Sequence, residues 1–189
     1  VLLYGPGGIG KSALAAMIAT AYTTFKGGVL WWSVQDDSLP QLIVRLGRAY
    51  NERIITESPD PLIHLQTAGN LLARGHGPLV VLDDIQNFEA AREFVRKVAD
   101  RVPLIMTSRQ SASGPWIPFE IGPLAREDAE TLFVQAARLD PVTAVVRGDV
   151  QGICDVLDGV PLELMLAGRH VAVSGQTPGE FLGALVNTS

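Results

Sequence analysis

A glycine-rich segment near the start of the sequence carries the residue types that bind phosphate. Gly5-Pro-Gly-Gly-Ile-Gly-Lys-Ser12 matches the pattern G-x-x-x-x-G-K-[ST], directly after an apolar run and directly before a helical pattern. Glycines let such a loop turn its backbone N–H groups inward around phosphate oxygens, and the helix that follows directs its positive end at the same anions. Lys11 can reach the β- and γ-phosphates, and the Ser12 hydroxyl can bind Mg²⁺. A glycine-rich turn without a ligand would need neither side chain. The phosphate-loop (Walker A) residues predicted to bind nucleotide are Gly5, Pro6, Gly7, Gly8, Ile9, Gly10, Lys11, Ser12 and Ala13.

Two adjacent carboxylates end a buried apolar run, Leu79-Val-Val-Leu-Asp-Asp84, in a Walker B pattern. Ligands of parallel sheets lie beyond the carboxyl ends of the strands, so we expect Asp83 to hold Mg²⁺ through water, opposite Ser12. We expect Asp84 to orient or deprotonate an attacking water. Because aspartate is shorter than glutamate, hydrolysis with this base would be slow. The alternative interpretation is that one of the two acids caps the helix that follows.

An arginine follows the next apolar run, in Thr107-Ser-Arg109. A guanidinium at the same sheet edge offers a planar fork of donors that suits a γ-phosphate. The alternative is a surface salt bridge. The catalytic residues predicted from the sequence are therefore Asp84, Lys11 and Arg109.

Apolar runs of strand length recur along the first two thirds of the chain, with helical patterns between them. Apolar residues at helical spacing follow the first and the third run. Strands that alternate with helices predict parallel β-α-β units, and continuously apolar runs fit a sheet covered on both faces. We therefore expect an α/β fold with a three-layer parallel sheet. The runs are Val1–Tyr4, Val29–Val34, Leu79–Leu82, Leu104–Thr107 and Ile117–Ile121.

The character of the sequence changes at Gly122-Pro123, after which only helical patterns are found. Four apolar patterns of helical type predict a small all-α subdomain of four helices. We expect a phosphate-loop nucleotide-binding domain at 1–122 and a helical subdomain at 123–189. Earlier in the chain, Asp36-Asp-Ser38 followed by Pro40 indicates the start of a helix and not a metal site.

Composition excludes several classes of protein. Apolar residues make up 47% and charged residues 19% of the 189, so the chain can bury a full core. The net charge of −5, without a basic run, argues against direct nucleic-acid binding. One cysteine, Cys154, excludes an internal disulfide, and no apolar run reaches membrane-spanning length. Because the sequence starts with Val1 inside an apolar run, we expect it to be a piece of a longer protein.

Together these residues resemble the NB-ARC family of STAND signal-transduction ATPases, which includes plant disease-resistance proteins, the apoptosome scaffold and many bacterial regulators. The matching elements are the phosphate loop, the double-acid strand, Thr107-Ser-Arg109 as first sensor, and Gly159-Val-Pro-Leu162 in the helical region. The resemblance implies a sheet of order 2-3-4-1-5, with the sensor strand between the phosphate-loop and acidic strands. It also implies that Pro161 and Leu162 bind the nucleotide, with Pro161 over the adenine. If the family resemblance is set aside, the local sequence predicts that Gly159 ends one helix and that Pro161 lies in the first turn of the next.

The resemblance implies a function as well. It describes a cytoplasmic ATP/ADP-dependent switch that uses Mg²⁺, hydrolyses ATP slowly and associates with itself in the ATP state of the full-length protein. It predicts no membrane partner and no direct nucleic-acid partner for this fragment. The family's winged-helix subdomain, whose histidine contacts the ADP β-phosphate, is missing here, so tight retention of ADP is not guaranteed.

Three other functions remain as alternatives. An AAA+-type turnover ATPase would be expected to have glutamate after Asp83 and Asn or Thr in place of Arg109. A P-loop kinase acting on a small molecule would need an acceptor site and a mobile Arg-rich lid, neither of which is evident. A degenerate module that binds without catalysis is disfavoured because Lys11, Ser12 and Asp83 are all present.

Overall fold

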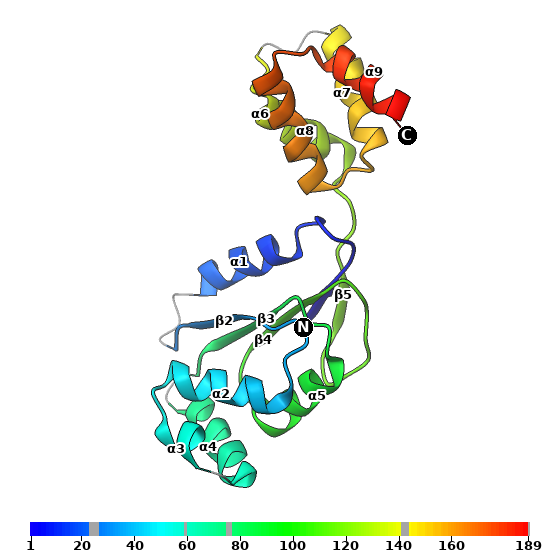
Figure 1. The fold of residues 1–189 in the computed structure, drawn as a ribbon. Coiled ribbons are helices and arrows are strands. Elements are labelled where there is room, and N and C mark those ends of the chain that lie inside the picture. Colours follow the sequence, from blue (N-terminus) through cyan, green and yellow to red (C-terminus); the bar gives the residue numbers. More distant parts are fainter. Residues whose placement is uncertain (23–26, 59, 75–76, 141–143, 189) are drawn as a thin grey trace. The chain divides into compact units, whose positions relative to one another are not determined.

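The computed structural model describes residues 1–22, 27–58, 60–74, 77–140 and 144–188. Within these ranges the chain forms five strands and nine helices (Figure 1). Contacts between residues divide the chain into two compact units. The first contains residues 1–6 and 11–120, and the second contains residues 7–10 and 121–189.

The first unit is built on a five-stranded parallel sheet. Its strands lie in the order β2-β3-β4-β1-β5, and each neighbouring pair is parallel. The α/β class expected from the sequence and the order 2-3-4-1-5 implied by the family resemblance are therefore confirmed. Because β4 is inserted between β1 and β3, the phosphate-loop, sensor and acidic strands end side by side at one edge. The strands are β1 (Leu2–Tyr4), β2 (Val29–Ser33), β3 (Leu79–Asp83), β4 (Leu104–Ser108) and β5 (Pro118–Glu120).

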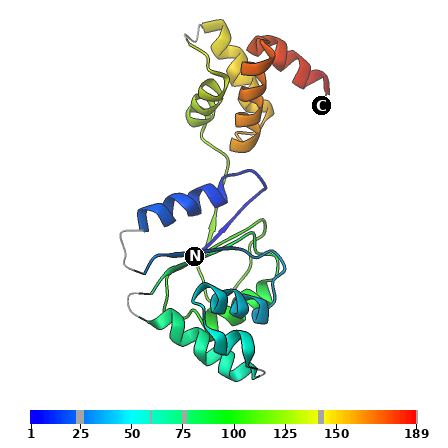
Figure 2. The same cartoon turned by 60° about the vertical axis from the view of Figure 1, so that its left-hand side comes forward.

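Helices cover both faces of this sheet (Figures 1 and 2). Helix α1 (Lys11–Tyr22) lies on one face, and four helices lie on the other. The central strands β3 and β4 are buried, as their continuously apolar sequences predict, and β3 exposes only part of its last residue, Asp83. The two outer strands differ from that expectation, because β2 is only partly buried and all three residues of β5 are exposed. The four helices of the second face are α2 (Leu39–Ala49), α3 (Arg53–Glu57), α4 (Pro61–Ala73) and α5 (Phe88–Lys97).

The core of the first unit lies between the sheet and these four helices. Phe94 of α5 is fully buried there and meets Trp32 of β2 edge to face, with ring centroids 6.5 Å apart. The predicted helix start before Pro40 is confirmed, since Ser38 precedes α2 and its N–H donates to the Gln41 side chain. Other buried residues of this core are Leu2, Leu42, Leu46, Leu71, Val80, Leu82 and Met106.

The second unit is helical beyond residue 121, and the expected four helices are present. Phe133 and Ile153 are fully buried in its core, which also includes Leu164. Gly168 permits the close packing of two helices, because a Cβ at this position would lie 2.6 Å from the Ala136 Cβ. The helices are α6 (Arg126–Ala137), α7 (Ala144–Val156), α8 (Pro161–Ser174) and α9 (Pro178–Thr188). Among the described residues, no helix combines the length and the apolar character needed to cross a membrane.

Candidate nucleotide-binding site

The glycine-rich loop leads from β1 directly into α1. Gly8 and Gly10 adopt positive φ angles of 75° and 101°, a backbone region that other residues rarely occupy. The side chain of Ile9 between them is buried and anchors the loop. Helix α1 begins at Lys11 and has no acidic residue in its first turn, so its positive end is not neutralised by a side chain of its own. This local geometry suits an anion.

The Lys11 side chain folds back over the loop that precedes it. Its Nζ donates to the carbonyl oxygen of Gly5 at 2.9 Å and to that of Pro6 at 2.7 Å. Burial lowers the pKa of Lys11, nearby Arg109 lowers it further, and Asp84 and Asp83 partly offset the effect. The ammonium therefore lies in a place where a bound anion would stabilise its charged form.

The side chains of Ser12, from α1, and Thr107, from β4, both contact Asp83 at the end of β3. The Ser12 hydroxyl of α1 donates to Asp83 Oδ1 at 2.7 Å, and the Thr107 hydroxyl of β4 donates to the same oxygen at 2.6 Å. Hydroxyl and carboxylate oxygens are the donors that Mg²⁺ prefers, so Ser12 and Asp83 fit the metal role predicted for them. Among the described residues, no group of three or more His, Cys, Asp or Glu side chains could hold a metal by itself. Phosphate and water oxygens would have to complete the coordination.

Asp84 occupies a constrained turn directly after β3. Its φ is 60°, and its N–H donates to the Thr107 hydroxyl at 2.9 Å. The helix that follows is capped by Asn87, whose side chain accepts from the Ala90 N–H at 3.0 Å. The alternative interpretation of the acidic pair as a helix cap is therefore wrong. Neither carboxylate is used for that purpose.

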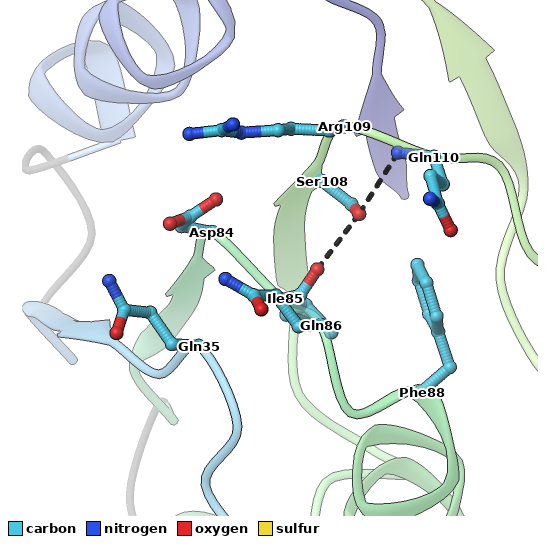
Figure 3. Close-up of a pocket in the computed structure, with 8 residues that line it drawn as sticks. All are labelled: Gln35, Asp84, Ile85, Gln86, Phe88, Ser108, Arg109 and Gln110. Carbon is cyan, nitrogen blue, oxygen red and sulfur yellow. Dashed lines mark hydrogen bonds between the residues drawn. The ribbon is translucent and has the colours of Figure 1, made fainter. Parts of the chain in front are cut away.

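Asp84 and Arg109 border a pocket of about 320 Å³ at the carboxyl ends of β2, β3 and β4 (Figure 3). Arg109 is exposed and lies near enough to Lys11 to affect its pKa. Among the described residues Arg109 forms none of the recorded ion pairs, which gives no support to the surface salt-bridge interpretation. The other residues that line the pocket are Gln35, Ile85, Gln86, Phe88, Ser108 and Gln110.

The residues predicted from the helical region belong to the second unit, together with loop residues 7–10. The Leu162 N–H donates to the carbonyl oxygen of Gly8 at 3.2 Å, and a Cβ on Gly8 would lie 3.0 Å from the Leu162 Cβ. Gly159 has a φ of 65° after α7, and Pro161 is the first residue of α8. The interpretation as terminator and helix start therefore describes this segment correctly.

Two residues of the site were not given a role by the sequence. In the sequence Thr107 is only the first residue of the tripeptide that ends in Arg109, yet its hydroxyl connects Asp83 with the Asp84 backbone. Gln35 follows β2 with a positive φ of 36°, and its carbonyl oxygen accepts from Gln86 and Asn87. A polar residue at the end of a strand beside the acidic strand is a signal that could have pointed to Thr107. Nothing in the local sequence indicates the role of Gln35.

The phosphate loop leads from β1 into α1, and β4 lies between β1 and the acidic strand. This is the P-loop NTPase fold. Solved structures with similar folds are the Pyrobaculum aerophilum Cdc6p, with a TM-score of 0.64 and 14% identity, and the Aeropyrum pernix ORC2 protein, with 0.60 and 17%. A third is a STAND protein with a tetratricopeptide repeat sensor from Pyrococcus horikoshii, with 0.59 and 15%.

The present chain is covered almost completely in these matches, at 95%, 99% and 100% respectively. It spans only 56%, 61% and 30% of the length of those proteins. No protein-family model matches the sequence, and no curated protein matches it. At these levels of identity the likeness concerns the fold.

Proposed function

We propose that this chain is the ATP/ADP-binding module of a STAND-type signalling NTPase of the NB-ARC kind. Residues 1–122 would form its nucleotide-binding domain and residues 123–189 its helical subdomain. The observation that carries the proposal is the cluster of Ser12, Asp83 and Thr107 beside Lys11, because its ammonium, hydroxyl and carboxylate groups are of the types that suit phosphate and Mg²⁺. The fold it shares with a STAND protein is consistent with this proposal, and the nucleotide complex of the similarly folded ORC2 protein supports nucleotide binding.

In this proposal, Lys11 exchanges the carbonyl oxygens of Gly5 and Pro6 for the β- and γ-phosphates of ATP. Ser12 and Asp83 would hold Mg²⁺, which would supply positive charge beside the phosphates. The remaining loop residues and Ala13 would surround the phosphates with backbone N–H groups. Pro161 and Leu162 would contact the adenine side of the nucleotide.

Slow hydrolysis would depend on Asp84 and Arg109. Asp84 accepts a proton from the attacking water, or orients that water, while the Arg109 guanidinium stabilises charge on the γ-phosphate. ADP and ATP would favour different conformations of the protein, with self-association of the full-length protein in the ATP state. Such a switch requires the two nucleotides to bind the two states with different affinities.

A turnover ATPase of the AAA+ type is the second candidate, since Cdc6p and the ORC2 protein have TM-scores as high as that of the STAND protein. The two candidates differ in the expected rate of ATP hydrolysis. Ordinary enzymes turn over at about 10 s⁻¹, whereas switch NTPases without activators hydrolyse at roughly 10⁻⁴ to 10⁻² s⁻¹. Asp84 in place of a glutamate and Arg109 in place of Asn or Thr favour the switch.

The first test is to denature a sample of the freshly purified chain and identify any released nucleotide by chromatography. A separate, folded and nucleotide-free sample is then titrated with Mg·ADP by calorimetry. The variant Lys11→Ala is expected to weaken Mg·ADP binding by roughly 10- to 100-fold, because it removes the charge-assisted contact to the β-phosphate, which contributes about 1.5–3 kcal/mol. Lys97→Ala is the matched control, since Lys97 pairs with Glu93 on the surface of α5. Equal affinity of wild type and Lys11→Ala would refute the site. Multiple turnovers near 10 s⁻¹ would favour the second candidate.

A further inference from the structure

The turn that carries Asp84 is held from both sides by neighbouring strands. On one side, Thr107 of β4 accepts the Asp84 N–H through its hydroxyl and the Ile85 N–H through its carbonyl, at 2.9 and 2.8 Å. On the other side, the Gln35 carbonyl accepts the Gln86 N–H at 2.9 Å and the Asn87 N–H at 3.3 Å. The four consecutive N–H groups of residues 84–87 thus donate to only two residues, Thr107 and Gln35. Asp84 lies at the start of this turn.

The Gln35 carbonyl would not reach the turn if β2 simply continued. The Gly28 carbonyl and the Val34 N–H both bond to β3, so alternate residues of β2 face that strand. Gln35 is out of phase with them, and in an extended backbone its carbonyl would point away from β3. Its φ of 36° reverses the peptide and directs the oxygen to the Gln86 and Asn87 N–H groups. For a residue that is neither Gly nor Asn, this conformation is strained.

We propose that Gln35 is a positioning residue whose reversed backbone carbonyl fixes the Asp84 turn for hydrolysis. The role belongs to the carbonyl and not to the side chain, which is exposed and lines the pocket in Figure 3. With Thr107 on the opposite side, Gln35 holds the backbone of the turn from which the Asp84 side chain projects. The catalytic part of this inference rests on the proposed function, whereas the structural part does not.

A series of substitutions separates the backbone from the side chain. Gln35→Gly and Gln35→Asn retain the positive φ, because glycine and asparagine tolerate it, while Gln35→Ala and Gln35→Val disfavour it increasingly. We expect single-turnover ATP hydrolysis to be at least tenfold slower in Gln35→Val than in Gln35→Gly, with Gln35→Ala between them. Affinity for Mg·ADP should stay within about threefold across the series, because the phosphate loop is untouched. Ser33→Val is the control, since it adds the same side chain within the regular part of β2.

Amide hydrogen exchange of Gln86 and Asn87 provides the second readout. Exchange should be at least tenfold faster in Gln35→Val than in wild type, and nearly unchanged in Gln35→Gly and Gln35→Asn. If Gln35→Gly loses hydrolysis as strongly as Gln35→Val, the side-chain amide is responsible and the inference is wrong. Equal exchange in all variants would also overturn it.

The two proposals can fail separately. A wild-type chain that binds no nucleotide refutes the proposed function, while the exchange rates still decide whether Gln35 holds the turn. A wild-type chain that binds Mg·ATP without cleaving it overturns the catalytic part of this inference alone. If Gln35→Val does not fold, Gln35→Ala provides the same comparison against Gln35→Gly.

Discussion

Thr107 offers the most direct test of how the site is held together. Its side chain is 1% exposed, donates to the Asp83 carboxylate at 2.6 Å and accepts from the Asp84 N–H at 2.9 Å. Thr107→Val keeps the shape of the side chain but removes both bonds. Loss of a hydrogen bond to a carboxylate costs about 1.5–3 kcal/mol, and a buried N–H without an acceptor costs about 1–3 kcal/mol more. The added methyl group returns about 1 kcal/mol, which leaves a net destabilisation of roughly 1.5–5 kcal/mol.

Urea unfolding followed by tryptophan fluorescence measures this change. The three tryptophans, Trp31, Trp32 and Trp116, all belong to the first unit, so the signal reports on the unit that contains Thr107. The midpoint should fall while the slope of the transition stays constant. Thr20→Val is the matched control in the same unit, because the Thr20 hydroxyl bonds the Ala16 carbonyl on the exposed side of α1. It should change the free energy of unfolding by less than about 0.5 kcal/mol.

Either of two results would refute the reasoning about Thr107. A Thr107→Val protein within about 0.5 kcal/mol of wild type would mean that the two hydrogen bonds contribute nothing net to stability. A Thr20→Val protein that loses as much as Thr107→Val would mean that any Thr-to-Val change in this unit has that cost.

Two further predictions concern the acidic pair and the cysteine. Asp84→Asn should keep Mg·ADP affinity within about threefold but slow single-turnover hydrolysis by roughly 10²–10⁴-fold, because it removes the proton acceptor. If calorimetry shows instead that this variant fails to bind Mg·ATP, the roles of Asp83 and Asp84 are reversed. Burial, with smaller contributions from Glu130 and Asp155, raises the pKa of the Cys154 thiol from 9.0 to about 11. Iodoacetamide should therefore alkylate the native chain at pH 8 at least about 100-fold more slowly than the urea-unfolded chain, with the rate rising toward pH 11. Because the folded pKa is the higher one, the contribution of Cys154 to stability should be fully present below pH 9 and be lost as the pH rises toward 11. Equal alkylation rates in the native and unfolded chains would contradict the raised pKa.

The local parts of the site could be predicted from the sequence. The loop from Gly5 to Ser12 needs glycine at fixed positions and a helix immediately after it, and both requirements are visible within a dozen residues. The buried strand before Asp83 and the helix start at Ser38 are equally local, since they depend on apolar runs and capping side chains. Helices α3 and α4 were not predicted from the sequence.

Contacts between strands could not be predicted in the same way. The bond from Ser12 to Asp83 joins residues 71 positions apart, and that from Thr107 to Asp83 joins residues 24 positions apart. Both exist because β4 lies between β1 and β3, and strand order depends on which long-range pairing buries the most apolar surface. The order had been expected only from the family resemblance.

The sequence by itself determined the residue types of the site and the elements that carry them, because turn chemistry, helix starts and hydrophobic periodicity are local properties. Tertiary structure alone decided that Thr107 connects the two acids and that Gln35 turns its peptide toward β3. The physical reason is that buried N–H and C=O groups must find partners, and those partners are set by neighbouring strands. At Gln35 that requirement overrides the local backbone preference, which no pattern along the chain records.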